Sequence, residues 1–318
     1  MSIDPADPRP LRVLFAGQSE RWEEYETPLS AAFARHGLEV ELDTEFPPET
    51  VDYIITAPNG TVQDFTPYTK AKAVLNLWAG VEGIIGNETL TQPLCRMIET
   101  GLTQGMVEWV TGHVLRHHLG LDRDITRDQP VWDFRVPPLA TDRKVTILGM
   151  GELGQACALA LAGLGFDVAG WSRSEKRVPG VECLSGEAGL TAAMNRAEIL
   201  VLLLPLTPAT RHLIDVATLA RLPKGAVILN PGRGLLIDDD ALLAALDAGH
   251  IAHATLDVFA VEPLPEGHPY WAHPSVTVTP HIASSTRPGT SSESIAENIR
   301  RCEAGEPLIG LVDRGRGY

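Results

Sequence analysis

Aromatic residues, cysteines and long apolar runs are all scarce in this sequence. Aromatic side chains make up 6% of the 318 residues, and the 4 cysteines show no C-x-x-C spacing. This pattern fits neither a disulfide framework nor a zinc knuckle, so we expect reduced and mostly buried thiols. Apolar runs such as residues 199–204 are far shorter than the ~18 to 20 residues that a membrane-spanning helix needs. We therefore expect no membrane span.

Basic residues are also few relative to acidic ones. The chain has 26 Lys and Arg against 41 Asp and Glu, a net charge of -15. This charge opposes binding to a nucleic-acid backbone or an anionic membrane, so neither is expected as a partner. Residues 1–10 are polar and proline-rich, without a basic region followed by an apolar stretch. We therefore expect no secretory signal and a cytoplasmic location.

The length predicts two domains, and the order of the segments predicts an α/β fold in which helices cover doubly wound parallel sheets. A first unit contains an amphipathic helix over 22–36, which Gly37 ends, and strands at 11–16, 40–42, 51–56 and 73–77. A helix at 106–119 follows. The stretch 122–141 has poor periodicity, and we interpret it as a long arm without a clear element.

A second, larger unit opens at Lys144. Its strands are predicted at 145–149, 168–171, 199–204, 226–230, 254–258 and 276–279, and most of them are apolar throughout. Strands of this kind are buried on both faces, as in a parallel sheet. Asp238 is expected to cap a helix that Gly249 ends, with Asp239 and Asp240 near its positive end. This acidic triplet therefore needs no metal.

A Gly-x-Gly-x-x-Gly pattern follows the first strand of this unit and begins a helix. The first glycine would permit a tight turn, the second the approach of a pyrophosphate, and the third close packing of helix and strand. An ordinary glycine-rich turn is the alternative, but the flanking strand and helix favour a dinucleotide site. The candidate cofactor-binding residues here are Gly149, Met150, Gly151, Glu152, Leu153 and Gly154, with Leu204, Pro205 and Asn230 after later strands.

The end of the next strand predicts which dinucleotide binds. Where NAD-binding chains carry an acidic residue for the ribose hydroxyls, this one has Trp171-Ser172-Arg173-Ser174. Hydroxyl donors and a guanidinium suit the 2′-phosphate of NADP(H). A solvated basic loop is the alternative, but a basic cluster at this place in an acidic chain favours NADP(H).

Three further segments, each following a predicted strand, carry polar residues suited to catalysis. They are Asn230-Pro-Gly-Arg233-Gly, the segment from Asp257 to Glu262-Pro-Leu-Pro, and Thr279-Pro-His281-Ile-Ala. Singly, each is more typical of a turn or a structural residue. Together they should meet at one sheet edge, because ligands bind beyond the carboxyl ends of parallel strands.

The order and spacing of these motifs resemble the D-2-hydroxyacid dehydrogenase family over nearly the whole chain. The Trp-Ser-Arg-Ser segment and the tail 312–318 resemble, more narrowly, its NADPH-dependent glyoxylate/hydroxypyruvate reductase branch. The resemblance implies catalytic Arg233, Glu262 and His281, with Asp257 near the nicotinamide carboxamide. It also implies two domains around a deep cleft, in which residues 1–100 plus 286–318 bind substrate and residues 101–285 bind the dinucleotide.

The chemistry of a 2-oxo acid fits these residue types independently. Its carboxylate suits the bidentate Arg233, and its carbonyl needs a proton as hydride arrives. His281 would donate that proton, and Glu262 would favour the imidazolium by hydrogen bonding to it. We therefore expect a reductase of small 2-oxo acids such as glyoxylate and hydroxypyruvate.

The segment 77–82 resembles the family's substrate loop, whose backbone amides bind the carboxylate. Trp78, Ala79 and Gly80 are therefore candidate substrate-binding residues. Trp78 replaces a glycine of the family's pattern, and its indole would either narrow the pocket or pack into the core. Glu82 replaces an aspartate.

Trp132 lies in the arm, which in the family joins two subunits, so a homodimer is expected. His113 and His117 have the spacing of a zinc-binding helix, but neither the glutamate of a zinc protease nor a third ligand accompanies them, so we expect no metal. Two alternatives to the expected function stay open: a reductase of a larger 2-oxo acid, and a dinucleotide-sensing scaffold of the same fold.

Overall fold

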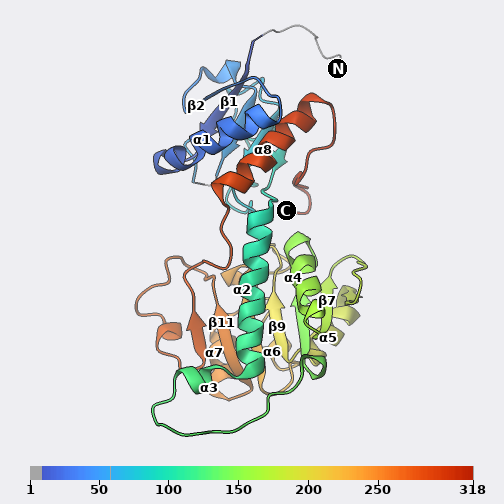
Figure 1. The fold of residues 1–318 in the computed structure, drawn as a ribbon. Helices are drawn as coiled ribbons and strands as arrows, with labels where there is room; N and C mark the ends of the chain where they lie inside the picture. Colours follow the sequence, from blue (N-terminus) through green and yellow to red (C-terminus); the bar gives the residue numbers. More distant parts are fainter. Residues whose placement is uncertain (1–8, 58, 318) are drawn as a thin grey trace. The chain divides into compact units, whose positions relative to one another are not determined.

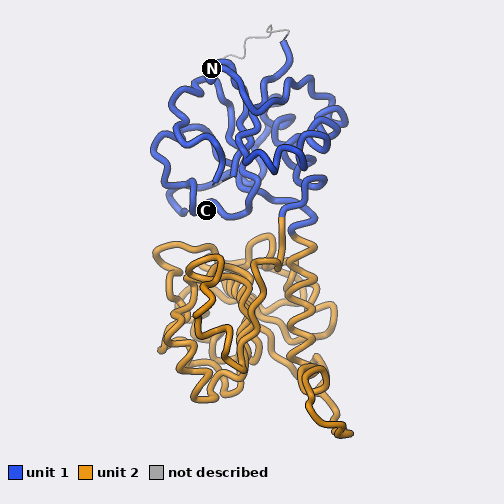
Figure 2. Tube along the Cα trace, turned by 90° about the vertical axis from the view of Figure 1, so that its left-hand side faces the viewer, with its two compact units in different colours: residues 1–102, 286–318 blue, residues 103–285 orange. Residues whose placement is uncertain are grey.

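The structure is a computed structural model that describes residues 9–57 and 59–317. Most of the segment in which we expected no secretory signal, and Tyr318 of the tail, lie outside these residues. The chain forms two compact units, one from residues up to 102 together with those from 286 onward, and one from residues 103–285 (Figure 2). Both are parallel sheets with flanking helices, so the predicted α/β class is confirmed.

The first unit is built on a five-stranded parallel sheet with the order β2-β1-β3-β4-β5. Its strands are β1 (Leu11–Ala16), β2 (Val40–Asp43), β3 (Tyr53–Thr56), β4 (Ala73–Asn76) and β5 (Leu94–Cys95). All four residues of β3 and all four of β4 are buried, as expected for central strands of a sheet covered on both faces. The short helix η1 (Pro48–Thr50) precedes β3.

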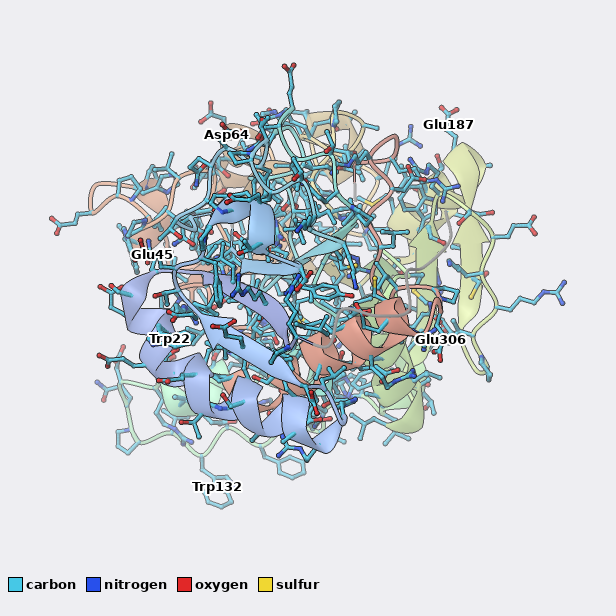
Figure 3. The ribbon with its side chains drawn as sticks, turned by 90° about the horizontal axis from the view of Figure 1, so that it is seen from above. Trp22, Glu45, Asp64, Trp132, Glu187 and Glu306 are labelled. Carbon is cyan, nitrogen blue, oxygen red and sulfur yellow. The ribbon has the colours of Figure 1, made fainter. Side chains whose placement is uncertain are left out.

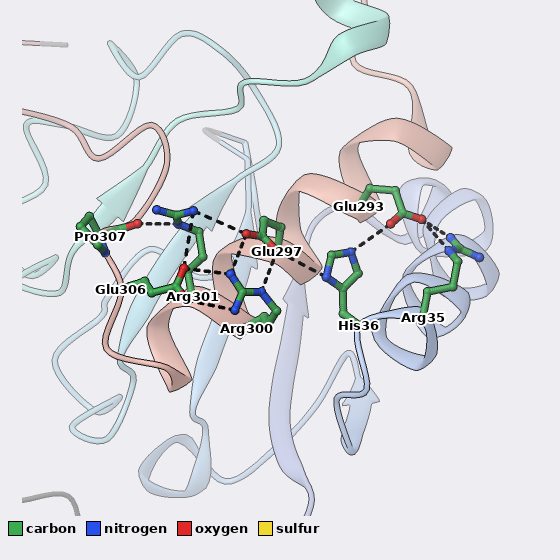
Figure 4. A network of polar contacts seen from close by, with 8 residues as sticks. All are labelled: Arg35, His36, Glu293, Glu297, Arg300, Arg301, Glu306 and Pro307. Atoms are coloured by element: carbon green, nitrogen blue, oxygen red, sulfur yellow. Dashed lines mark hydrogen bonds and ion pairs between the residues drawn. The ribbon is translucent and has the colours of Figure 1, made fainter.

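The C-terminal helix α8 (Pro288–Glu303) belongs to this first unit and lies beside α1 (Ser19–Arg35) (Figure 1). Apolar residues of both helices share one core with the sheet. At the surface, Glu293 pairs with Arg35 and with His36, whose Nε2 lies 3.1 Å from Glu293 Oε2 (Figure 4). Buried packing and this ionic network together hold α8 against α1.

The second unit has a seven-stranded parallel sheet with the order β12-β11-β10-β9-β6-β7-β8. The strands are β6 (Lys144–Leu148), β7 (Asp167–Ser172), β8 (Glu182–Ser185), β9 (Ile199–Leu202), β10 (Ala226–Asn230), β11 (Ile251–Leu256) and β12 (Val276–Val278). Chain order reverses between β6 and β9. In a doubly wound sheet, this switch point is where a dinucleotide binds.

Helices cover this sheet on both sides (Figure 1). They are α2 (Thr100–Leu119), α3 (Asp122–Ile125), α4 (Glu152–Gly163), α5 (Gly186–Arg196), α6 (Val216–Leu219) and α7 (Asp239–Asp247), with the short helices η2 (Ala140–Asp142), η3 (Gly234–Leu236) and η4 (Pro269–Trp271). The predicted cap is confirmed, because the Asp238 side chain accepts a hydrogen bond from Ala241 N at 3.1 Å. No helix in the described part of the chain could cross a membrane.

Several of the predicted elements are corrected. The arm contains a helix, because its first residues form α3. Arg116 Nε, in α2, donates to Asp122 Oδ1 of this helix at 2.7 Å. Strands β9 and β11 end at Leu202 and Leu256, two residues earlier than predicted, and the residues that follow them lie in loops. Those loops lie where the candidate site forms.

Candidate functional site

The candidate residues of the second unit all lie at one edge of its sheet. Because every strand pairing in the sheet is parallel, the loops that follow β6, β7, β9, β10, β11 and β12 leave from the same side. We predicted this arrangement because each of these segments follows a predicted strand. The parallel pairing of the strands accounts for it.

The glycine loop after β6 has the shape of a pyrophosphate cradle. Gly149 has a φ of 110°, and a Cβ there would lie 2.4 Å from the carbonyl oxygen of Leu203. A Cβ at Gly154 would lie 1.8 Å from the carbonyl oxygen of Gly149, so helix and strand pack closely only without a side chain. A Cβ at Gly151 would meet nothing within 4 Å, which leaves the start of α4 open. Open backbone amides at a helix N-terminus fit a pyrophosphate.

Not every candidate in this region can offer its side chain to a cofactor. Met150 is 1% exposed, and its sulfur lies 2.1 Å from where a Cβ on Gly170 would be, so this side chain packs beneath β7. Leu204 is also buried in the core. Both residues can reach a dinucleotide only through their backbone. Glu152 is exposed and Leu153 half-buried at the start of α4.

The end of β7 presents hydroxyl and guanidinium groups. Ser172 Oγ donates to the carbonyl oxygen of Ser174 at 2.7 Å, which closes a tight turn around Arg173. Arg173 and Ser174 are exposed. Trp171 packs against the core, and its Nε1 donates to Gly186 O at 2.8 Å. The turn therefore carries donors for a phosphate and no carboxylate.

The loops after β10 and β11 are in direct contact. A Cβ on Gly234 would lie 2.0 Å from the carbonyl carbon of Phe259, so only glycine permits this approach. Asn230 is buried, and its side chain accepts from Gly232 N at 3.1 Å and donates to Arg233 O at 2.9 Å. This amide shapes the backbone that carries the half-buried Arg233. A direct contact between Asn230 and a cofactor stays a prediction.

Asp257 is fully buried and organises the loop that carries His281. Its Oδ1 accepts from Thr279 Oγ1 at 2.5 Å and from Ile282 N at 2.9 Å, and its Oδ2 accepts from Ala283 N at 2.8 Å. His281 has a φ of 54°, a conformation that few non-glycine residues adopt. The carboxylate thus holds this loop in an uncommon shape, while its place near a nicotinamide carboxamide stays a prediction.

His281 and Glu262 form the predicted hydrogen-bonded pair. His281 Nδ1 lies 2.6 Å from Glu262 Oε2, and Glu262 Oε1 accepts from Phe259 N at 2.8 Å. The backbone therefore orients the carboxylate, and the carboxylate orients the imidazole. The His281 side chain is 52% exposed, and the bond to Glu262 engages only Nδ1. Nε2 is left to act on a ligand.

In the first unit, the candidate substrate loop follows β4. Trp78 is 40% exposed and belongs to none of the apolar cores, so the alternative that it packs into the core is wrong. Ala79 and Gly80 are half-buried. The signal for this loop in the sequence was its resemblance to the family's pattern.

His117, one of the two histidines with zinc-helix spacing, packs against the sheet of the second unit. His117 Nε2 lies 2.9 Å from Thr255 Oγ1, and its ring packs on His253 with the ring centres 4.9 Å apart. Burial lowers the pKa of His117 to about 3 and that of His253 to about 4. Within residues 9–57 and 59–317, no group of three or more His, Cys, Asp or Glu could hold a metal ion.

Comparison with known proteins agrees with these features. The family model for the NAD binding domain of D-isomer specific 2-hydroxyacid dehydrogenases matches residues 113–283. The chain is 40% identical over 255 residues to glyoxylate/hydroxypyruvate reductase A of Yersinia enterocolitica, which covers 78% of this chain and 82% of the relative.

Solved structures give the same result over the full length. A D-isomer specific 2-hydroxyacid dehydrogenase of Xanthobacter autotrophicus, in complex with NADPH and MES, is 41% identical, with a TM-score of 0.87 over 98% of this chain and 100% of that one. An NADPH-dependent glyoxylate/hydroxypyruvate reductase of Sinorhizobium meliloti, in complex with NADP and sulfate, is 34% identical, with a TM-score of 0.84 over the same shares. The chain belongs to the family of D-isomer specific 2-hydroxyacid dehydrogenases.

Proposed function

We propose that this protein reduces small 2-oxo acids, glyoxylate and hydroxypyruvate first, to 2-hydroxy acids with NADPH, and that His281 donates the proton. The observation that carries the proposal is the 2.6 Å hydrogen bond between His281 Nδ1 and Glu262 Oε2, in a loop cluster beside a dinucleotide cradle. Relatives named for this activity, and neighbours crystallised with NADPH or NADP, support it.

The cofactor is held by the chain's own donors. Open backbone at Gly151 and the start of α4 bind the pyrophosphate. Arg173 and Ser174 bind the 2′-phosphate through a guanidinium and a hydroxyl, and Ser172, whose hydroxyl donates to Ser174 O, holds the turn in shape. When bound, NADPH supplies the hydride.

Arg233 and His281 act on the substrate. The Arg233 guanidinium binds the carboxylate in a bidentate manner and polarises the neighbouring carbonyl, which fixes the angle at which the carbonyl carbon accepts hydride. His281 transfers a proton from Nε2 to the carbonyl oxygen as negative charge develops there. Glu262 accepts the hydrogen bond of His281 Nδ1 and so holds the imidazole with Nε2 available to the substrate.

Initial rates of NADPH oxidation with a panel of 2-oxo acids test this function. Glyoxylate and hydroxypyruvate should give the highest kcat/KM. Higher values with larger 2-oxo acids would move the substrate to the first alternative. Binding of NADPH without turnover of any 2-oxo acid would support the dinucleotide-sensing scaffold instead.

Replacing the phosphate-binding turn should change the choice of cofactor. A charge-assisted hydrogen bond contributes about 1.5 to 3 kcal/mol, so we expect NADPH to be preferred over NADH by about 10- to 150-fold. Ser172→Asp combined with Arg173→Ala should erode or reverse this preference, because a carboxylate accepts from the ribose hydroxyls of NADH and repels a phosphate. The measurement is kcat/KM for both cofactors. Equal values for the unmodified protein would contradict the assignment.

Arg177→Ala is the matched control for this exchange. Arg177 is an exposed cation on the same segment, beyond the turn that Ser172 closes. Its removal should lower NADPH affinity only through long-range charge and leave the preference largely intact.

The arm is the surface that we assign to a second copy of the chain. Trp132 is 92% exposed and points away from the ribbon (Figure 3), and Phe134 and Val136 are 81% and 80% exposed. Exposed apolar side chains grouped in this way mark an interaction surface. We therefore propose a homodimer, for which light scattering should give twice the mass of one chain; a mass of one chain would contradict it.

The cytoplasm is the proposed location. The four cysteines are all free, as expected for thiols kept reduced. A reductase that draws on NADPH also fits that compartment.

A further inference from the structure

We propose that Asn76, the last residue of β4, is a positioning residue for the substrate's carboxylate: its buried amide turns backbone N–H groups of the loop 77–81 outward as donors. This inference rests on the proposed function and adds a residue to its substrate site. Asn76 belongs to no motif that the sequence analysis singled out.

The side chain of Asn76 holds two carbonyl groups of the loop at once. Its Nδ2 donates to Trp78 O at 2.9 Å and to Gly80 O at 3.0 Å. Two carbonyl partners identify this atom as the nitrogen of the amide. Asn76 is 1% exposed, so both carbonyl oxygens are drawn toward the interior.

Other donors reinforce the same orientation. Met97 N donates to Trp78 O at 2.9 Å, and Thr286 Oγ1 donates to Leu77 O at 2.8 Å. The carbonyl groups of residues 77, 78 and 80 are thus all occupied by donors of the same unit.

The orientation of the carbonyl groups fixes that of the amides. In a trans peptide the C=O and the N–H of one plane point in opposite directions. Trp78 O shares its plane with Ala79 N–H, and Gly80 O shares its plane with Val81 N–H. Both N–H groups therefore point away from Asn76. Across the described residues, neither donates a hydrogen bond to the protein. Neighbouring backbone N–H groups without protein acceptors suit an anion such as a carboxylate.

The other atom of the amide argues for function over stability. Asn76 Oδ1 is buried and has no hydrogen-bond partner in the described chain. A buried acceptor left without a donor destabilises the folded state, so an amide at this strand end is a poor choice for stability alone. Only its donor side has an evident task, which is to shape the loop.

Asn76→Ala tests the proposal in the full-length protein. We expect KM for glyoxylate to rise about 10-fold, the equivalent of one good hydrogen bond, while kcat and the Kd of NADPH stay within about threefold. The Kd of oxalate, a dicarboxylate probe that is not reduced, should rise in parallel when measured by calorimetry with NADP⁺ present. Asn76→Ser, whose single hydroxyl proton can serve one carbonyl at a time, should shift both values less, and carries the test if Asn76→Ala does not fold.

Asn298→Ala is the matched control. Asn298 is 4% exposed in the same unit and likewise binds loop backbone, donating to Ile309 O at 3.1 Å and accepting from Ile309 N at 2.8 Å. Its loss should lower thermal stability without raising either KM or the Kd of oxalate. If the Asn76 variants matched Asn298→Ala, with KM and the Kd of oxalate unchanged, the proposal would be overturned. Absence of turnover in the unmodified protein would instead contradict the proposed function.

Discussion

His281→Asn should lower kcat for the reduction of glyoxylate by about 10² to 10⁴-fold, the range over which a positioned proton donor accelerates a reaction. The variant suits the site, because asparagine tolerates the φ of 54° at this position better than most residues. The loop should therefore keep its shape, held by Asp257 through Ile282 N and Ala283 N. Steady-state kinetics at saturating NADPH gives the value.

Glu262→Gln is the control for the His281 variant. It keeps the imidazole and an oxygen for Phe259 N but removes the negative charge beside His281 Nδ1. The loss in kcat should be smaller than for His281→Asn. A His281→Asn variant that keeps nearly full kcat would remove His281 from the role of proton donor.

Arg233→Ala should reduce kcat/KM for 2-oxo acids by at least about 10- to 150-fold, since a charge-assisted contact with the carboxylate is lost. Misalignment of the carbonyl with the hydride donor should add to this loss. Asn230 holds the loop backbone through Gly232 N and Arg233 O, neither of which the substitution removes. The Kd of NADPH, measured by fluorescence titration, should therefore change little.

Arg221→Ala provides the comparison for charge alone. Arg221 is an exposed arginine of the same unit with a hydrogen bond to Thr191 Oγ1. Its substitution removes one positive charge and should leave kcat/KM near normal. A collapse of NADPH binding in Arg233→Ala, with normal reduction once the cofactor is bound, would show that Arg233 serves the cofactor and not the substrate.

The elements that the sequence predicted best are those whose pattern is local. Strand β10 (Ala226–Asn230) has the predicted bounds, because a glycine and a proline flank this mostly apolar run and mark both ends of the strand. β8 and α5 were not predicted. β8 is a half-buried edge strand of four residues and therefore lacks the apolar run that marks the central strands. Helix α3, with the four residues 122–125, is too short for a periodic signal.

The site residues also differ in how far a local sequence pattern could predict their roles. Glycine spacing predicted the cradle after β6, and the positive φ of Gly149 and the contact at Gly154 give its physical reason. Sequence alone placed Asp257 and Asn230 beside a ligand. In the structure their side chains hold loops in place through hydrogen bonds to the backbone. One example is the bond from Ala283 N to Asp257 Oδ2, which joins residues 26 positions apart. Contacts of this kind depend on the folded chain and leave no local pattern.

Asn76 is the clearest example of a residue whose role had no signal in the sequence. An asparagine at the end of a short apolar strand looks like an ordinary strand end, and only the two carbonyl groups around its Nδ2 distinguish it. Loop resemblance identified residues 77–82 without indicating what holds them in shape.

The central claim is that hydride passes from NADPH to the carbonyl carbon of a 2-oxo acid. NADPH carrying two deuterium atoms at C4 of the nicotinamide, incubated with hydroxypyruvate and the protein, tests it directly by mass spectrometry of the product. Our account predicts glycerate with one deuterium atom at C2, formed at a rate that His281→Asn lowers by about 10² to 10⁴-fold. Glycerate without deuterium, or no glycerate while NADPH remains bound, would contradict it.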